Sequence, residues 1–267
     1  MASGRRALVT GGTRGLGFAL ARELSRSRCP VFVTGRSPEA ARAAAAALAA
    51  ETGGTVHWGA GDSGSWEDCS RLAREARDAM GGIDIWVANA GINQGRGMVW
   101  ELEASDMERL VRTDLLGPML SAKAAFEAMR EGGGWLWLVE GHGSDGRVMA
   151  GLSAYGTTKR AVAYLWRALA LEASASDSAV KVGALSPGIM ITDFLRGSLD
   201  EADPERRRRV LAAFNALGDR PETVAAFLVP RMLAARRSGT RIAWLTGSKA
   251  AWRFASAPFT RRKLIED

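Results

Sequence analysis

The amino-acid sequence predicts an α/β fold, with one doubly wound parallel sheet of about seven strands and helices on both faces. Short apolar runs of strand length alternate with helix-length stretches along the whole chain. The runs are almost continuously apolar, as is typical of strands that are buried on both faces of a parallel sheet. The 267 residues show no linker, composition break or internal repeat. We therefore expect a single domain that spans residues 1–267.

Seven runs have the length and composition of buried strands. Each is short and rich in Val, Ile, Leu or Trp, which favour strands in a covered sheet. The predicted strands are residues 7–10, 31–34, 56–59, 83–87, 135–139, 180–185 and 242–245. Ligands of such folds bind beyond the carboxyl ends of the strands, so the residues that follow the strands should form the rim of the active site. These residues are Thr10, Arg36, Asp62, Asn89, Gly141 and Pro187.

Helices are predicted between the strands. The run at 40–50 is mostly alanine, the residue with the highest helix propensity. The other predicted helices span about 15–27, 65–80, 104–130 and 153–174. A helix then follows each of the first five strands and provides the crossover that parallel neighbours require.

The composition limits the classes of protein to be considered. No apolar run reaches the roughly 18 residues that a membrane-spanning helix needs. Cys29 and Cys69 are the only cysteines and are far apart in sequence, which favours a reduced compartment without disulfides. The two histidines, His57 and His142, give little support for a metal site, so no metal is expected. Six residues before the first strand leave little room for a targeting segment, unless one has been removed.

The net charge of +7 favours anionic partners. The arginines are spread along helices without interleaved aromatic residues, and we find no nucleic-acid-binding motif, so no nucleic-acid partner is expected. A phosphorylated cofactor, or an acidic membrane or pigment surface, accounts for the charge equally well.

A glycine-rich turn follows the first predicted strand. Residues 10–17 read Thr-Gly-Gly-Thr-Arg-Gly-Leu-Gly, and a helix begins within them. Glycines allow a tight turn and bring helix amides against the phosphate oxygens of a dinucleotide. The first gap is wider than in the common Gly-x-Gly-x-x-Gly fingerprint, but the position is that of a Rossmann-like dinucleotide site. The predicted pyrophosphate-binding residues are Thr10, Gly11, Thr13, Arg14, Gly15, Leu16 and Gly17.

The end of the second strand indicates which dinucleotide binds. Arg36 stands where cofactors without a 2′-phosphate usually meet an acidic residue. Arg14 adds a second guanidinium and Ser37 a hydroxyl, a set that matches a dianionic phosphate, so NADPH is predicted. Asp62 is expected to accept from the adenine amino group. The residues expected near the adenosine ribose are Asn89, Ala90 and Gly91.

Tyr155 and Lys159 lie four residues apart in a predicted helix. This is about one helical turn, so the phenol and the ammonium project from the same face. A cation about 4 Å away at an effective dielectric near 20 is worth roughly 4 kcal/mol, which would lower the phenol pKa by up to about three units. Tyr155 would then act as a general acid near neutral pH. Together with the glycine-rich turn, the pair predicts a nicotinamide-dependent oxidoreductase.

These motifs together resemble the short-chain dehydrogenase/reductase family over the whole chain. The resemblance implies that Tyr155 protonates a carbonyl oxygen during hydride transfer, while Lys159 binds the nicotinamide ribose and lowers the phenol pKa. It also implies that Pro187 and Gly188 lie against the nicotinamide carboxamide, and that Thr192 contacts the carboxamide or the pyrophosphate. A homo-oligomer is expected, because helices of this kind form the interfaces common in the family.

Two positions depart from the family pattern. The usual asparagine of the long helix, which helps to hold a proton-relaying water, is Asp114 here. The usual serine thirteen residues before the tyrosine is His142, and the nearest hydroxyl is that of Ser144. The glycines around Ser144 would let the loop bulge and bring its hydroxyl to the same place, so we expect Ser144 to bind the developing oxyanion. His142 is the alternative.

Four segments resemble one subgroup, the chlorophyll(ide) b reductases of plants and algae. They are residues 140–147 with 154–160, 185–195, 221–230 and 245–250. This resemblance implies reduction of the 7-formyl group of chlorophyll or chlorophyllide b to hydroxymethyl, with NADPH. It also implies the chloroplast stroma, with thylakoid association as an option, or the cytoplasm of a bacterium.

The segment 193–220 lies where the family places a mobile lid over the substrate. Substrate contacts are expected from Met190, Phe194, Leu195 and Phe214. The tail, residues 244–267, carries Trp252, Phe254 and Phe259 among basic residues. We expect the tail to pack in the core or at a subunit interface, with peripheral contact to an anionic membrane or a pigment protein as the alternative.

Two other functions fit the same residues. A 3-oxoacyl or other small-carbonyl reductase uses the same catalytic pair, but usually has a serine where this chain has His142. A catalytically silent protein that binds NADP(H) or a pigment would be consistent with Asp114 and the displaced serine.

Overall fold

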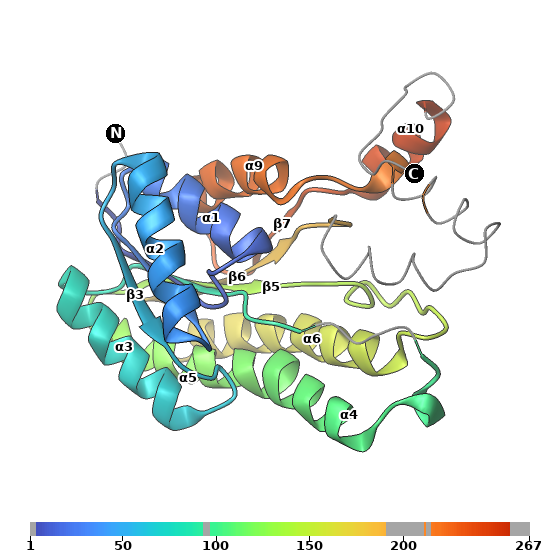
Figure 1. The fold of residues 1–267 in the computed structure, drawn as a ribbon, viewed down its shortest axis with the longest axis horizontal. Coiled ribbons are helices and arrows are strands. Elements are labelled where there is room, and N and C mark those ends of the chain that lie inside the picture. The colour runs from blue at the N-terminus through green and yellow to red at the C-terminus, as the bar shows by residue number, and fades with distance from the viewer. Residues whose placement is uncertain (1–3, 93–96, 191–210, 212–214, 257–267) are drawn as a thin grey trace.

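A seven-stranded parallel sheet forms the centre of the computed structural model, which describes residues 4–92, 97–190, 211 and 215–256. The strands are β1 (Ala7–Val9), β2 (Val31–Gly35), β3 (Val56–Ala60), β4 (Ile85–Ala88), β5 (Gly134–Val139), β6 (Val180–Ser186) and β7 (Thr240–Ala243). Their order is β3-β2-β1-β4-β5-β6-β7, and every neighbouring pair is parallel. The predicted doubly wound parallel sheet is confirmed (Figure 1).

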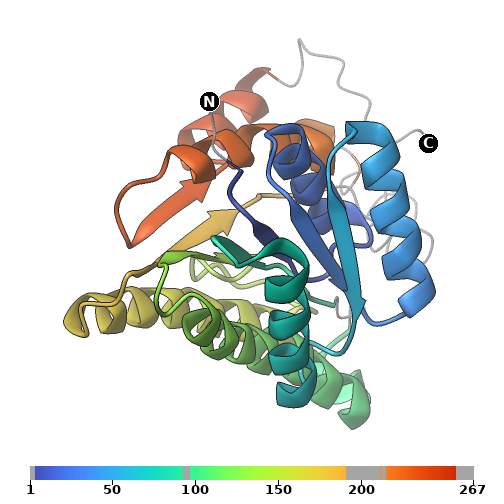
Figure 2. The ribbon, with the colours of Figure 1, turned by 90° about the vertical axis from the view of Figure 1, so that its left-hand side faces the viewer.

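Helices cover both faces of the sheet (Figures 1 and 2). One layer contains α1 (Gly15–Arg26), α2 (Pro38–Thr52) and α9 (Pro221–Ala234), and the other contains α3 (Trp66–Met80), α5 (Gly117–Ala128) and α6 (Ser153–Ala175). A separate hydrophobic core lies under each layer, one around Leu20 and Leu228 and one around Leu136 and Trp166. Burial on both faces explains why the strands are almost continuously apolar.

The strand order reverses between β1 and β4, and this reversal determines where a ligand site can form. The connections from β1 run towards β3 on one side, while β4 to β7 extend on the other. At such a switch point the loops after β1 and β4 diverge and leave a crevice at the carboxyl edge of the sheet. The glycine-rich turn follows β1, so it lies at this crevice.

The helix predicted over 104–130 is divided. The structure has α4 (Ala104–Val111), a π-helical turn (Arg112–Leu116) and then α5. Pro118 lies in the first turn of α5 and lacks the amide that an α-helix would need to bond the Asp114 carbonyl. The wider π turn accommodates this missing donor, and π turns occur frequently at functional sites. Asp114 lies within it.

Two described helices are absent from the sequence prediction, namely α9 and α10 (Gly247–Ser256). Pro230 inside α9 argues against a helix, although Pro221 at its start and Glu222 in its first turn are ordinary start signals. A 3₁₀ turn (Val99–Glu101) precedes α4. No described helix is both long and apolar enough to cross a bilayer.

Candidate active site

The glycine-rich turn between β1 and α1 forms a close-packed cradle. Gly11 and Gly15 have φ angles of 63° and 57°, in the left-handed region that favours glycine. A Cβ atom at Gly17 would lie 2.1 Å from the Gly11 carbonyl oxygen, so only glycine fits there. Arg14, at the N-cap position, makes no side-chain capping bond. The first-turn amides of α1 therefore face the cradle without such a cap, as an anion site at a helix N-terminus requires.

Thr10 and Asn89 fix the cradle to the end of β4. Thr10 Oγ1 accepts hydrogen bonds from the amides of Asn89 and Ala90, each at 3.0 Å. Asn89 Nδ2 donates to the carbonyl oxygens of Thr10 at 3.0 Å and Gly11 at 3.1 Å. The side chains of Thr10 and Asn89 thus hold the glycine-rich turn against the end of β4. The ribose contact of Asn89, Ala90 and Gly91 stays a prediction.

Arg36 and Ser37 lie at the end of β2, beside the cradle. A Cβ atom at Gly35 would lie 2.4 Å from Thr13 Cγ2, which shows how closely the two turns approach. Arg36 is exposed and makes no hydrogen bond or ion pair with any described residue. Ser37 is already engaged, because its Oγ caps α2 by accepting from the Ala40 amide at 3.1 Å and donates to Glu39 at 2.7 Å. Arg36 is thus the side chain available to an anion at this position.

Asp62, after β3, has partners within the fold. Its Oδ1 accepts from the Gly64 amide at 2.9 Å, and its Oδ2 lies 3.3 Å from Arg112 Nε. The carboxylate therefore holds its own turn against the π-helical segment. Its contact with an adenine amino group stays a prediction.

Tyr155 and Lys159 occupy the first turns of α6, and Asp114 faces them from the π turn. Lys159 Nζ lies 2.8 Å from Asp114 Oδ2 and 5.5 Å from the centroid of the Tyr155 ring. The Asp114 side chain is fully buried, and its Oδ1 accepts from the Ile92 amide at 2.7 Å. Three of the predicted catalytic residues are therefore brought together at the end of β4.

These neighbours set the protonation states of the pair. Burial raises the pKa of Tyr155, Lys159 opposes this effect and Asp114 adds to it, so the pKa lies above its usual value. Burial would lower the pKa of Lys159, but Tyr155 and Asp114 together raise it above its usual value. The predicted net lowering of the phenol pKa by Lys159 is therefore wrong for this site. The charge of Lys159 alone does not set the phenol pKa, because desolvation and the charge of Asp114 both act against it.

The loop after β5 lies directly against the phenol. A Cβ atom at Gly141 would lie 2.4 Å from the Tyr155 hydroxyl, so a side chain there would displace it. Gly143 has a φ of 92°, and its Cβ would lie 2.7 Å from Gly156 Cα. The two glycines allow this loop to pack over the start of α6.

Ser144 and His142 have different surroundings in this loop. The Ser144 hydroxyl is buried, donates to the Lys159 carbonyl oxygen at 3.0 Å and accepts from the Gly141 amide at 3.1 Å. A serine hydroxyl has a single proton, so Ser144 braces the loop against α6 in this arrangement. His142 Nε2 is buried and has no hydrogen-bond partner among the described residues. A buried polar atom of this kind needs a ligand or a water as its partner.

The substrate side of the site is described in part. Pro187 is buried after β6, and Gly188 has a φ of 75°, with Leu245 so close that a Cβ atom would lie 2.6 Å from its Cβ. Met190 forms an isolated parallel bridge with Asp219. Thr192, Phe194, Leu195, Phe214 and most of the segment 193–220 lie outside the described residues.

The described part of the tail is anchored through Asp219. This buried carboxylate accepts from Trp244 Nε1 at 2.6 Å and Arg253 Nη1 at 2.5 Å, and so joins α10 to the end of β7. Trp252 and Phe254 are 67% and 53% exposed. Of the two placements expected for the tail, core packing is therefore wrong for these two side chains, and a subunit interface stays a prediction.

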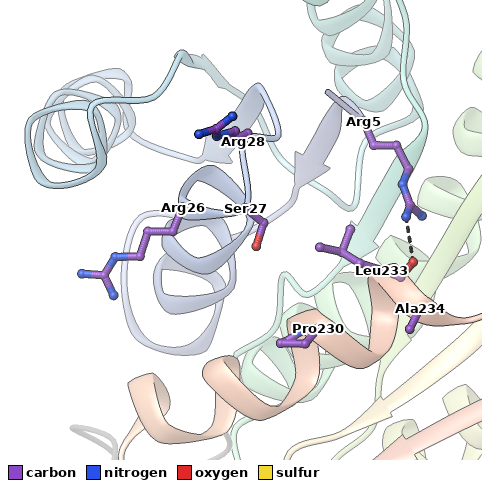
Figure 3. Close-up of a pocket in the computed structure, with 7 residues that line it drawn as sticks. All are labelled: Arg5, Arg26, Ser27, Arg28, Pro230, Leu233 and Ala234. Atoms are coloured by element: carbon purple, nitrogen blue, oxygen red, sulfur yellow. Dashed lines mark hydrogen bonds between the residues drawn. The ribbon is translucent and has the colours of Figure 1, made fainter. Parts of the chain in front are cut away.

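A cavity of about 640 Å³ lies away from these residues (Figure 3). It is lined by Arg5, the turn after α1 and the end of α9, all at the amino ends of the strands. Arg5 Nη2 donates to the Leu233 carbonyl oxygen at 2.7 Å across it. None of its lining residues is a predicted site residue, so it is not part of the candidate active site.

Comparison with known proteins decides the family. Residues 5–203 match the model of the short chain dehydrogenase family. The chain belongs to that family. The resemblance and the oxidoreductase class predicted from the sequence are confirmed.

Two relatives and one solved structure are similar over most of their lengths. Chlorophyll(ide) b reductase NOL of Arabidopsis thaliana is 35% identical over 91% of this chain and 70% of its own length. The rice protein of that name (Oryza sativa subsp. japonica) is 34% identical over 93% and 74%. The crystal structure of levodione reductase superposes with a TM-score of 0.81 at 25% identity, and covers 93% of this chain and 99% of its own. The similarity to the chlorophyll(ide) b reductases predicted from four segments thus extends over nearly the whole chain.

Proposed function

We propose that this enzyme reduces the 7-formyl group of chlorophyllide b to hydroxymethyl with NADPH. The observation that carries the proposal is the identity of 34–35% to two chlorophyll(ide) b reductases over more than nine tenths of this chain. The buried Tyr155–Lys159–Asp114 group supports a carbonyl reduction in particular. The relatives are named chloroplastic, and we propose the chloroplast for this chain as well.

NADPH, when bound, would supply the hydride, and the crevice fits a phosphorylated dinucleotide. The Gly11–Gly17 cradle and the uncapped amides of α1 would hold the pyrophosphate. Arg36, exposed and without a described partner, would bind the 2′-phosphate, with Arg14 beside the same cradle. Lys159 would donate to the nicotinamide ribose, with Pro187, Gly188 and Thr192 near the carboxamide.

Tyr155 is the proposed proton donor. A raised pKa keeps the phenol protonated at neutral pH, which a reductase needs, because the acid must carry its proton when the carbonyl accepts the hydride. Lys159 remains a cation beside it and stabilises the phenolate that forms. The negative charge of Asp114 balances the positive charge of Lys159. Asp114 also accepts a hydrogen bond from the Ile92 amide, which fixes the ion pair to the loop after β4.

His142 is the proposed partner of the developing oxyanion. The sequence favours Ser144, but that hydroxyl donates to the Lys159 carbonyl, whereas His142 Nε2 is buried without a described partner. A ring nitrogen that carries a proton can donate to the carbonyl oxygen as negative charge develops. Ser144 then has the supporting task of holding the loop on α6.

An apolar surface near the crevice suits a large flat substrate. Val148 and Met149, in the loop after β5, are 96% and 43% exposed, and Trp100, in the loop after β4, is 80% exposed. A hydrogen bond from the Gly97 amide to the Gly151 carbonyl oxygen, 3.3 Å long, joins the two loops. A macrocycle needs such an open, apolar wall, whereas a small ketone needs only a narrow slot. Met190 would extend the wall.

We also propose a homo-oligomer. Tyr164 and Leu171 on α6 are 74% and 72% exposed, and Met119 on α5 is 47% exposed. Tyr164 and Leu171 are seven residues apart, so they lie on one face of the helix. A second copy of the chain would cover this apolar face, while Trp252 and Phe254 of α10 are available to a membrane or pigment protein.

The test is NADPH consumption by the purified protein with chlorophyllide b, phytylated chlorophyll b in detergent, and an acetoacetyl thioester. We expect chlorophyllide b to be reduced fastest, because its propionate is free to bind a basic side chain, a contact that esterification removes. Reduction of the thioester alone would indicate a small-carbonyl reductase. NADPH binding without turnover of any substrate would indicate a silent binding protein.

A further inference from the structure

A buried glutamate lies directly behind the loop that contacts Tyr155. Glu140 is the first residue after β5, its side chain is 2% exposed, and the next residue is Gly141. Carboxylates are seldom fully buried unless they are paired. None of the catalytic roles proposed above uses Glu140.

Donors from two elements, α6 and β7, meet at Glu140. Trp166 Nε1, on α6, donates to Glu140 Oε1 at 3.1 Å. Arg241, on the edge strand β7, places Nε 2.8 Å and Nη2 2.7 Å from Glu140 Oε2. Nη2 of the same arginine also donates to Ser186 Oγ at 3.0 Å. One guanidinium therefore joins the end of β5 to the end of β6.

The joined positions are the origins of two loops of the site. Gly141 and His142 follow Glu140, while Pro187 and Gly188 follow Ser186. Trp166 is seven residues after Lys159 on α6, so the network is also fixed to the helix of the catalytic pair. Planar guanidinium groups hold such bridges in one geometry, which the point charge of a lysine reproduces only in part.

We infer that Glu140 and Arg241 are positioning residues for the reaction. They hold the Gly141–His142 backbone against the Tyr155 hydroxyl and keep it in register with the turn after β6. Burial of a charge in an otherwise apolar sheet edge is costly, and geometric specificity is a benefit that an apolar pair would not supply. The inference rests on the proposed function only in taking Tyr155 as the proton donor.

The test uses Glu140→Gln and Arg241→Met, with Arg241→Lys as the conservative variant. Arg237→Met is the matched control, because Arg237 is exposed, lies in the turn before β7 and has no described side-chain partner. Small displacements of reacting groups are costly, so kcat of the two network variants should fall about tenfold to a hundredfold. The NADPH dissociation constant should change less than kcat, because the pyrophosphate cradle and Arg36 lie on the other side of the switch point. Arg241→Lys should recover part of the loss.

Hydrogen exchange gives a readout that needs no substrate. In both network variants the amides of residues 141–146 should exchange faster, while Arg237→Met should leave them as in the parent protein. The double variant should be no slower in turnover than the worse single variant, because both changes break one network. Unchanged exchange and unchanged kcat in Glu140→Gln would overturn the inference. The inference would also be overturned if the two network variants lost kcat, NADPH affinity and thermal stability to the same degree and Arg241→Lys recovered none of the loss. That is the pattern of a purely structural role. If the parent protein reduces no carbonyl substrate, the proposed function fails, and exchange alone decides the role of Glu140.

Discussion

The two sides of the switch point hold their charges in different ways. On the β1–β3 side, Arg36 is exposed and has no partner in the described part of the chain. On the β4–β7 side, Asp114 and Glu140 are buried and meet Lys159 and Arg241 at 2.8 and 2.7 Å. The charges on the catalytic side are thus paired within the fold, whereas Arg36 is available to pair with an anionic ligand. Changes to these buried ion pairs should alter geometry, protonation and stability together, and a change of Arg36 should alter affinity alone.

The largest effect is expected from Tyr155→Phe, which removes only the proton donor. Turnover should fall by about a hundredfold to ten-thousandfold, while fold and NADPH binding remain. Steady-state rates, a melting curve and a cofactor titration measure the three properties. A variant that kept about a tenth of the rate would contradict the role of the phenol as the acid.

The next effect compares His142→Ala with Ser144→Ala in the same loop. Loss of one donor to a developing oxyanion costs about a hundredfold in kcat, and we expect this for His142→Ala. Ser144→Ala should instead lose about 1 kcal/mol of unfolding free energy, because its bonds to Lys159 and Gly141 are internal. Denaturant melts beside kcat distinguish the two. The opposite ranking in kcat would return the oxyanion role to Ser144.

On the exposed side, Arg36→Asp should raise the Michaelis constant for NADPH about tenfold to a hundredfold, since a charge-assisted bond to phosphate is lost. The unfolding free energy should change by less than about 0.5 kcal/mol, because the side chain has no described partner. Initial rates with NADPH and NADH give the preference directly. An unchanged preference would assign the phosphate to Arg14 or another residue.

The smallest effect, and the most specific, is the pH response of Asp114→Asn. Asp114 raises the pKa of both Tyr155 and Lys159, so its neutralisation should move the alkaline limb of the rate profile to lower pH. A group whose pKa is raised in the folded state, as for Tyr155 and Lys159, contributes stability that is fully present below pH of about 10. This contribution is lost as the pH rises through the folded-state pKa. The variant should therefore lose part of that stability.

The chain has two tyrosines, which allows a direct measurement. In a Tyr164→Phe background, ultraviolet absorbance at alkaline pH reports Tyr155 alone. A phenol that titrates at the same pH with Asp114 and with Asn would show that the carboxylate does not control it.

The fold could be predicted from the sequence because the relevant signals are local. Alternation of apolar strands with helices, the glycine-rich turn and the four-residue Tyr155–Lys159 spacing are all periodic or short-range patterns. The environment of Tyr155 could not be predicted in the same way. Its pKa depends on burial and on Asp114, which the π turn just before Pro118 orients. Glu140 and Arg241 are 101 residues apart, so no local pattern relates them.

The preference for Ser144 shows a second limit of sequence reasoning. The glycines around it do let the loop approach α6, as Gly143 and Gly156 show. Sequence spacing cannot tell, however, that the hydroxyl finds the Lys159 carbonyl there. The contacts expected from Phe194, Leu195 and Phe214 stay predictions.

The central claim is that this active site delivers a hydride and a proton to the formyl group of chlorophyllide b. The most direct test incubates the purified protein with chlorophyllide b and NADPH carrying deuterium at the transferable position of nicotinamide C4. Mass spectrometry of the pigment should find the deuterium on the carbon of a new 7-hydroxymethyl group, and Tyr155→Phe should produce almost none. Unlabelled and unreduced pigment from protein that binds NADPH and reduces an acetoacetyl thioester would contradict the claim.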